Sequence, residues 1–221
     1  MKKVFFLFLA LVASLAIQAQ IETKPDSTGK NSDELQTLFT KTGQTGWWLS
    51  ADFTWTKFDS RDLFLGGMSG GMIINHSLSI GLAGYGTMNS QNLRYSGISD
   101  VADVYLYGGY GGLKLEYRIN PLKKINVAFP LLIGGGGLTY STWAMDYMHG
   151  NNNYGNSEFT YAWDSFFVIE PGVVVGVNLL KYIRLDAGVS YILAPGINLP
   201  KTSNNPLNSF NAGISLKFGR F

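Results

Sequence analysis

The residue types best suited to chemistry are few in this sequence and lie far apart. The chain has 221 residues with two histidines and no cysteine. His149 stands near Asp146, Asn151 and Asn153, a set that could serve a hydrolytic Ser/His pair or bind a metal ion. No second histidine has the spacing of a zinc motif, and His76 falls in a tight turn, so a solvated loop is the simpler interpretation. We therefore expect no catalytic residue, no metal ligand, no cofactor and no enzymatic activity.

Two glycine clusters invite comparison with phosphate-binding loops. They are Gly108-Gly109-Tyr110-Gly111-Gly112 and Gly134–Gly137. Neither matches G-x-G-x-x-G or a P-loop with its Lys-Ser/Thr pair. Glycine within a strand more often allows close packing or a bend at a barrel corner, and we favour that interpretation.

A further set of polar residues is more informative, because charges recur at alternate positions of otherwise apolar segments. Lys114, Glu116 and Arg118 are one example. In a strand, such positions share one face. The full set contains four bases and four acids: Asp52, Lys114, Glu116, Arg118, Glu170, Arg184, Asp186 and Lys217. We expect these side chains to form a lumen charge network with partners on other strands, because unpaired buried charges are costly. A proton or ion pathway is the alternative.

The segments that carry these charges alternate apolar and polar residues with period two, as half-buried strands do. Eight such segments are recognisable, each of about ten or more residues, the length that a tilted strand needs to cross a bilayer: 47–56, 64–74, 78–87, 103–119, 125–133, 167–177, 183–191 and 210–218. The connections near 75–77, 120–123 and 178–181 are tight. Those near 88–102, 142–160 and 193–206 are long and rich in Asn, Ser, Gly and Tyr. Short turns at one end and long loops at the other are typical of outer-membrane barrels.

Composition indicates which face of the strands points outward. The chain is 46% hydrophobic and only 14% charged, against about 25% charged in soluble domains. It has no uninterrupted apolar helix of spanning length, and a closed barrel is the other structure that satisfies every backbone group in lipid. The polar faces carry Gly, Ser, Ala and a few charges, which suits a narrow interior. We therefore predict an all-β fold, an eight-stranded antiparallel up-and-down transmembrane β-barrel, rather than a soluble ligand carrier.

The N-terminus reads as an export signal. Lys2 and Lys3 precede an apolar run from Val4 to Ile17, and Ala19 is a small residue at the expected cleavage point, as in secretory signal peptides. We predict a signal peptide at 1–19, a flexible periplasmic segment at 20–45 and the barrel at 46–221. Without its first 19 residues the chain has 15 basic and 15 acidic residues, which disfavours a nucleic-acid partner.

The end of the sequence resembles the terminal assembly signal of outer-membrane barrels. In the tract 211–218, Gly213, Leu216 and Phe218 occupy the positions of the glycine and the alternating hydrophobic residues. The region 45–221 resembles the small OmpA/OmpX-type architecture. The stretches 74–82, 118–121, 129–134 and 166–172 more closely resemble uncharacterised outer-membrane β-barrel proteins of Bacteroidota.

These resemblances imply a bacterial outer-membrane location, contact with outer-membrane lipid and insertion by the barrel assembly machinery. We expect a monomer whose lumen is polar and filled by side chains. Its role is structural or one of surface interaction, with an extracellular partner bound through the long loops. A lipid-modifying outer-membrane enzyme and a small channel are the alternatives.

Overall fold

The computed structural model describes residues 45–88, 90–98, 103–141 and 160–221. The predicted signal peptide, all but the last residue of the predicted 20–45 segment, and the loop that holds His149 lie outside the described residues. The elements are β1 (Thr45–Phe58), β2 (Arg61–Ile74), β3 (Leu78–Thr87), the 3-10 turn η1 (Ser90–Asn92), β4 (Arg94–Tyr95), β5 (Val104–Ile119), β6 (Ile125–Ser141), β7 (Thr160–Leu180), β8 (Ile183–Ile192) and β9 (Ser209–Arg220). No helix in the described part of the chain is long and apolar enough to cross a membrane.

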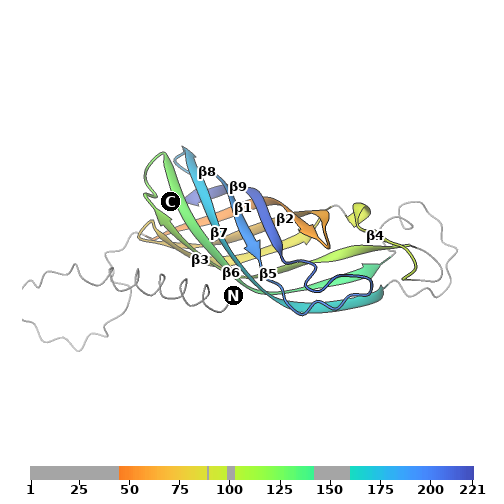
Figure 1. Cartoon of the computed structure of the whole chain (residues 1–221). Helices are drawn as coiled ribbons and strands as arrows, with labels where there is room; N and C mark the ends of the chain where they lie inside the picture. Colours follow the sequence, from red (N-terminus) through yellow and green to blue (C-terminus); the bar gives the residue numbers. More distant parts are fainter. Residues whose placement is uncertain (1–44, 89, 99–102, 142–159) are drawn as a thin grey trace, which may run out of the picture. The chain divides into compact units, whose positions relative to one another are not determined.

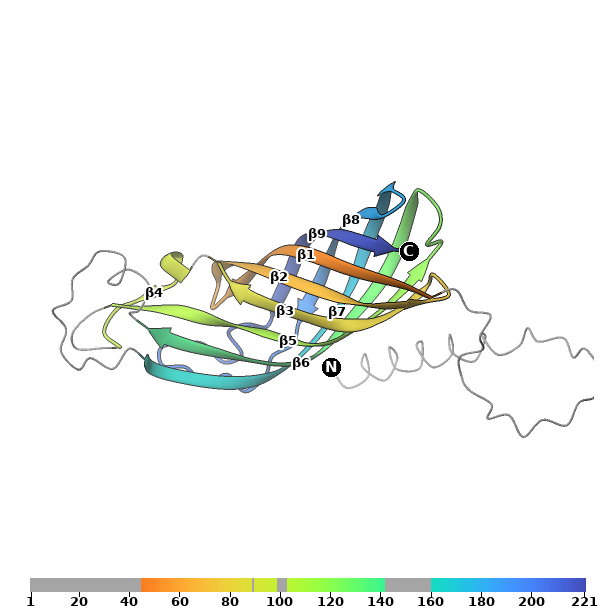
Figure 2. The same cartoon turned by 180° about the vertical axis from the view of Figure 1, so that it is seen from behind.

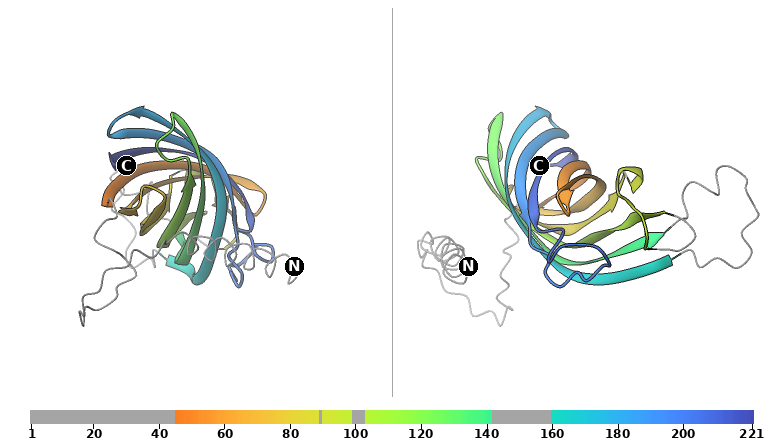
Figure 3. Two further views of the ribbon diagram at one scale, coloured as in Figure 1. Left: turned by 90° about the vertical axis from the view of Figure 1, so that its left-hand side faces the viewer. Right: turned by 45° about the vertical axis from the view of Figure 1, so that its right-hand side comes forward.

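The long strands form one closed antiparallel sheet (Figure 1 and Figure 3). Their order is β3-β2-β1-β9-β8-β7-β6-β5, and β3 pairs with β5 from Leu78↔Tyr117 to Gly86↔Gly109, which closes the ring. The first and last strands, β1 and β9, pair from Trp47↔Arg220 to Trp55↔Ala212. Closure leaves no free sheet edge around the ring. The predicted all-β, eight-stranded antiparallel up-and-down barrel is confirmed. The two-residue β4, which pairs only with β5, was not predicted.

Burial along the strands follows the predicted period of two. In β1, the side chains of Trp48, Ser50 and Asp52 point into the barrel and are buried, while Trp47 and Leu49 between them are exposed. The same alternation continues in β9, where buried Lys217 lies between exposed Leu216 and Phe218. The outside of the barrel is thus the apolar face, as the composition indicated.

The two ends of the barrel differ (Figure 1 and Figure 2). The turn end, as we name it, holds the connections 75–77, 120–124 and 181–182 and the C-terminus. The opposite loop end holds the Asp59–Ser60 turn, η1, β4 and the segment 193–208. At Asp59, Ser60, Asn75, His76 and Asn120 the φ angle is positive, a conformation for which Asn, Asp and His are enriched. This explains why these short connections can reverse the chain.

The interior changes character along its length, and this corrects one prediction. The lumen is polar only toward the turn end. Toward the loop end, and reaching the middle of the barrel, it is filled by a cluster of buried apolar side chains, which we call the apolar plug: Phe58, Leu63, Leu65, Ala83, Leu93, Tyr95, Val104, Leu106, Tyr110, Leu132, Leu138, Tyr140, Phe166, Val168, Ile192, Ala194, Ile197, Leu199 and Leu207. The prediction of a polar lumen was therefore wrong for the loop-end half, because the inward positions of the strand ends are apolar there and the loops pack on them.

The segment 193–208 supplies part of the apolar plug. Ile197, Leu199 and Leu207 are each at most 5% exposed. The segment is anchored by hydrogen bonds from Asp59 N to Pro206 O (2.8 Å) and from the Tyr140 hydroxyl to Pro200 O (3.2 Å). It therefore closes the loop end of the barrel rather than extending freely from it.

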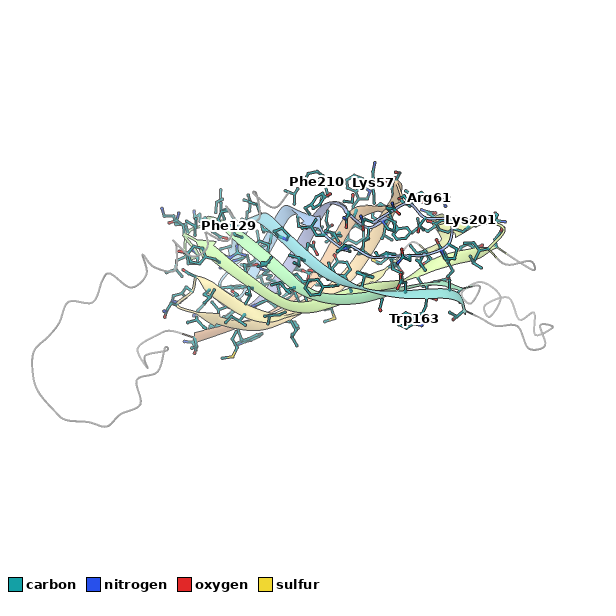
Figure 4. The ribbon with its side chains drawn as sticks, turned by 60° about the horizontal axis from the view of Figure 1, so that its bottom comes forward. Lys57, Arg61, Phe129, Trp163, Lys201 and Phe210 are labelled. Carbon is teal, nitrogen blue, oxygen red and sulfur yellow. The ribbon has the colours of Figure 1, made fainter. Side chains whose placement is uncertain are left out.

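The segment around β4 packs beside it. Arg61 lies with its guanidinium carbon 4.5 Å from the centre of the Tyr95 ring and donates a hydrogen bond to Arg94 O (2.8 Å). Lys201 donates to Ser96 O (2.7 Å), and Figure 4 shows Arg61 and Lys201 near the loop end, in line with Lys57. Two connections that are distant in sequence are thus joined by cations at the loop end.

Candidate functional site

The most organised polar feature is a ring of four alternating charges in the half of the lumen near the turn end. Arg118 Nη2 lies 2.7 Å from Glu116 Oε1 and 2.6 Å from Asp186 Oδ2. Lys217 Nζ lies 2.7 Å from Glu116 Oε2 and 2.9 Å from Asp186 Oδ2. Each of the four side chains is at most 5% exposed. Every charge therefore has two partners of opposite sign, an arrangement that offsets the cost of removing the charges from water.

Strand geometry explains how these side chains meet. Glu116 and Arg118 are two residues apart in β5 and so point to the same side. Asp186 in β8 and Lys217 in β9 reach them across the lumen, and β8 pairs with β9 so that Asp186 stands opposite Ser215. The expectation that partners come only from other strands was wrong for Arg118, since Glu116 is its neighbour on the same strand.

Gly176 and Asn126 complete this region, and sequence reasoning missed both. The Asn126 amide oxygen accepts a hydrogen bond from Arg118 Nη1. A Cβ at position 176 would collide with Arg118, Asn126 and Asp186. Glycine at this inward position of β7 therefore leaves room for the guanidinium group. A lone glycine in a strand is the only sequence signal that could have identified it.

Lys114 and Asp52 lie in the lumen but do not touch each other. Lys114 Nζ donates to Ser69 Oγ (3.2 Å) and to the Tyr85 hydroxyl (3.4 Å), and both of these groups donate to Asp52 Oδ2, at 2.8 and 3.5 Å. Among the described residues, no carboxylate lies within ion-pair distance of Lys114. Two neutral hydroxyl groups thus bridge the Lys114 ammonium and the Asp52 carboxylate.

Trp48 provides an aromatic contact that charge counting could not predict. Lys217 Nζ lies 4.9 Å from the centre of a Trp48 ring, and Lys114 Nζ lies 5.6 Å from one. Both distances fall within the range of cation–π attraction. Trp48 therefore joins the ring of four charges to the Lys114–Asp52 group.

Glu170 is held by neutral donors alone. Its carboxylate accepts hydrogen bonds from the Tyr110 hydroxyl (2.8 Å), Ser190 Oγ (2.5 Å) and Asn211 Nδ2 (2.7 Å). Arg184 also stands apart from the acids. It donates to Asn178 Oδ1 (2.6 Å) and Pro121 O (3.2 Å), and so joins β7 to the β5–β6 turn at the turn end. Of the eight predicted network residues, the structure brings four into direct ion pairs and holds the other four by separate contacts.

A small cavity lies between the charged ring and the apolar plug. Its volume is about 70 Å³, and its walls include Lys114, Glu170, Asp186, Thr54 and Asn211. The Thr54 hydroxyl and the Asn211 amide oxygen have no protein partner in the described structure. Polar walls of this kind suit a few ordered waters, at about 30 Å³ each.

Within the described residues, the histidines and the glycine clusters do not form the catalytic, metal-binding or phosphate-binding sites considered from the sequence. His76 lies in the β2–β3 turn, and the residues around His149 lie outside the described residues. No group of three or more potential metal ligands occurs in the part of the chain that the structure describes. The two glycine clusters lie inside β5 and β6, where Gly109, Gly111 and Gly112 pair with Gly137, Gly135 and Gly134. They are strand-pairing glycines and form no phosphate-binding loop.

The terminal-signal residues lie on β9. Leu216 and Phe218 face outward and are 38% and 41% exposed, whereas Gly213 faces the lumen. A side chain at Gly213 would collide with Thr54, so packing against β1 also requires this glycine. Their role as an assembly signal stays a prediction.

Comparison with known proteins identifies solved structures with a similar fold. No family model matches the chain, and no curated protein sequence matches it. Among solved structures, the barrel is similar to Neisserial surface protein A, with a TM-score of 0.54 at 10% identity over 80% of this chain and 99% of that chain. Two others are the N-terminal β-barrel domain of Pseudomonas aeruginosa OprF (TM-score 0.43, 12% identity, 80% and 99% covered) and Ail, the attachment invasion locus protein of Yersinia pestis (0.38, 14%, 79% and 97%). At these identities the similarity concerns the fold, and the resemblance to Bacteroidota proteins stays a prediction.

The ring of charges predicts unequal effects for two isosteric substitutions. Glu116→Gln leaves Lys217 and Arg118 with one carboxylate between them, so we expect a loss of about 3 kcal/mol in unfolding free energy. Glu170→Gln is the matched control. Its partners are neutral and the Tyr110 hydroxyl can also accept, so we expect a loss below about 1.5 kcal/mol. Urea denaturation in detergent micelles measures both.

A double mutant tests whether the charges act as one unit. Combining Glu116→Gln with Lys217→Met removes one charge of each sign and leaves the Arg118–Asp186 pair intact. The two losses should therefore be sub-additive by about 0.5–3 kcal/mol. Additive losses would show that water hydrates each charge independently, and would contradict a side-chain-filled lumen.

Proposed function

We propose that this chain is an integral outer-membrane β-barrel protein with a closed lumen, which presents its loop end at the cell surface for binding to an extracellular partner. One observation carries the proposal: the outside of every barrel strand is apolar and exposed, while the charges lie inside. Large exposed side chains include Phe53, Met72, Leu82, Leu113, Phe129, Val175, Val189 and Ile214, from all eight barrel strands. Such a surface in water would be an aggregation liability, whereas in lipid it is the stable arrangement.

The apolar band has the dimensions of a membrane. On β1 it runs from Trp47 to Trp55 and is followed by Lys57, while Arg220 lies opposite Trp47. Eight residue steps span about 26 Å along a strand, or roughly 20 Å of height at a tilt of about 40°. Figure 4 shows other aromatic side chains toward opposite ends of the barrel, with Phe129 toward the turn end and Trp163 toward the loop end. Aromatic residues at both borders of an apolar band of about 25 Å are typical of membrane barrels.

The filled interior favours a closed barrel over a channel. The apolar plug occupies the loop-end half of the lumen, and the charged ring occupies the other half. An eight-stranded barrel is just wide enough for side chains to fill it. The proposal includes no enzymatic activity.

Planar-bilayer recording distinguishes the closed barrel from the small channel. Purified protein inserted into a planar bilayer should produce no stepwise current above the bare membrane, since ions would have to cross both the plug and the ring. Reproducible single-channel steps would overturn the closed-lumen proposal.

An arginine scan tests the lipid face. Leu131 faces outward in the middle of the band, between Leu115 of β5 and Pro171 of β7. Leu131→Arg should cost about 2–4 kcal/mol when the protein is refolded into vesicles. Ile119→Arg, at the end of β5 next to the turn end, is the matched control and should cost about 1 kcal/mol or less. Equal costs at both positions would place the bilayer elsewhere.

Single cysteines test the orientation, because the chain has none of its own. Asn204→Cys at the loop end and Lys181→Cys at the turn end both replace exposed residues. On whole cells, a membrane-impermeant maleimide should label Cys at position 204. It should label position 181 only after the outer membrane is permeabilised. The reverse pattern would invert the proposed topology.

A further inference from the structure

The turn end of the barrel carries an excess of positive charge. Lys123, Lys124, Lys181 and Arg220 are all exposed there. Within the described ranges, no acidic side chain lies at this end except those inside the lumen. We call these four cations the basic rim.

In the rest of the described barrel, positively and negatively charged side chains are equal in number. At the loop end, four bases face four acids: Lys57, Arg61, Arg94 and Lys201 with Asp59, Asp62, Asp103 and Asp164. The eight lumen charges also cancel. The positive excess of the described residues is therefore located on the basic rim, where partners for it must come from outside the barrel.

The basic rim is one continuous surface on one side of the turn end. Asn178 of β7 binds the neighbouring connection through Lys124 O (2.9 Å, from its backbone N) and Lys123 O (2.7 Å, from Nδ2). Gly219 N donates to Tyr182 O (3.0 Å), which joins β9 to the β7–β8 turn. The rim thus follows the arc from β5 through β6, β7 and β8 to β9. At the same end of β1, β2 and β3 the described residues are Thr45, Gly46, Asn75, His76 and Ser77, none of which is Lys or Arg.

Exposed apolar residues lie beside these cations, in the β5–β6 turn and around the end of β7. Leu122 is 72% exposed beside Lys123, and Leu180 is 64% exposed beside Lys181. Leu179 and Tyr182 are also exposed, and the Lys181 ammonium lies 5.4 Å from the centre of the Tyr182 ring. Leucine side chains in a tight turn gain nothing from exposure to water. Cations that extend from such an apolar surface are typical of side chains that reach from lipid to the headgroup layer.

We propose that the basic rim binds the phosphate headgroups of anionic phospholipids in the leaflet next to the turn end. The apolar turn residues favour a lipid over an acidic protein, because they continue the apolar band of Ile125 and Phe218 into the interface. The headgroup phosphates supply the negative charge that the barrel lacks there. The inference rests on the proposed membrane insertion, and it adds a lipid selectivity that insertion alone does not require.

Spin-labelled lipids in vesicles test this selectivity. The full chain is refolded into phosphatidylcholine vesicles that contain a trace of spin-labelled phosphatidylglycerol or spin-labelled phosphatidylcholine, and electron paramagnetic resonance gives the fraction of each held at the protein. Wild type should hold phosphatidylglycerol at least about threefold more strongly than phosphatidylcholine, because the exposed cations attract an anionic headgroup but not a zwitterionic one. High salt should remove most of this preference.

Two matched variants locate the site. Lys123→Gln with Lys181→Gln removes half of the rim charge and should lower the preference at least about twofold. Lys57→Gln with Lys201→Gln removes the same charge from the loop end and should leave the preference unchanged. An unchanged preference in the first variant, or an equal fall in both variants, would overturn the inference.

Insertion is measured separately in each sample by protection from protease. Absence of insertion for wild type would refute the proposed function itself. Insertion with equal retention of the two labelled lipids would refute only the basic rim as a lipid site. Binding of soluble polyglutamate to the inserted wild type without a lipid preference would assign the rim to an acidic protein partner instead.

Discussion

The structure depends on one constraint, which is that a closed sheet of eight strands has an interior no wider than the side chains that fill it. Closure pairs the backbone hydrogen-bonding groups of every strand. The side chains alone therefore determine which face of the sheet points outward and which points into the lumen. With apolar residues outside, polar residues must lie inside, where there is too little room for bulk water. The four ion pairs among Glu116, Arg118, Asp186 and Lys217 are the consequence. Charges in so narrow a space persist only when each has partners of the opposite sign.

The period of two made most of the fold predictable from the sequence. Inward and outward residues were separable in most strands, because a one-residue slip would reverse both faces at once; the glycine-rich segment 64–74 gave no such separation. The charged residues of the lumen were recognisable for the same reason, since alternate positions of a strand share a face. Strand ends were less predictable. β7 runs from Thr160 to Leu180, past its most regular stretch at both ends, because pairing with the long β6 extends its start and pairing with β8 extends its end.

The contacts within the lumen were not predictable, because they depend on register around the barrel. The displacement of each strand relative to the next determines which charged side chains meet. That displacement cannot be read from the sequence pattern of a single strand. Glu170 therefore lies among Tyr110, Ser190 and Asn211 rather than beside a cation. Gly176 and Trp48 were missed for a related reason. Their importance comes from a partner on another strand and not from their own neighbours in sequence.

The change from polar to apolar along the lumen separates two tasks of the barrel. The charged ring joins β5, β8 and β9 near the turn end, and the apolar plug binds the segment 193–208 at the other end. Since apolar packing tolerates volume-conserving exchange better than a charged pair tolerates the loss of one partner, the loop end is the half that can vary at lower cost. Loops that pack on an apolar base can therefore change their exposed residues while the ring holds the strands together. Under the proposed function, variation would fall at the loop end, where the extracellular partner binds, and away from the paired charges of the ring.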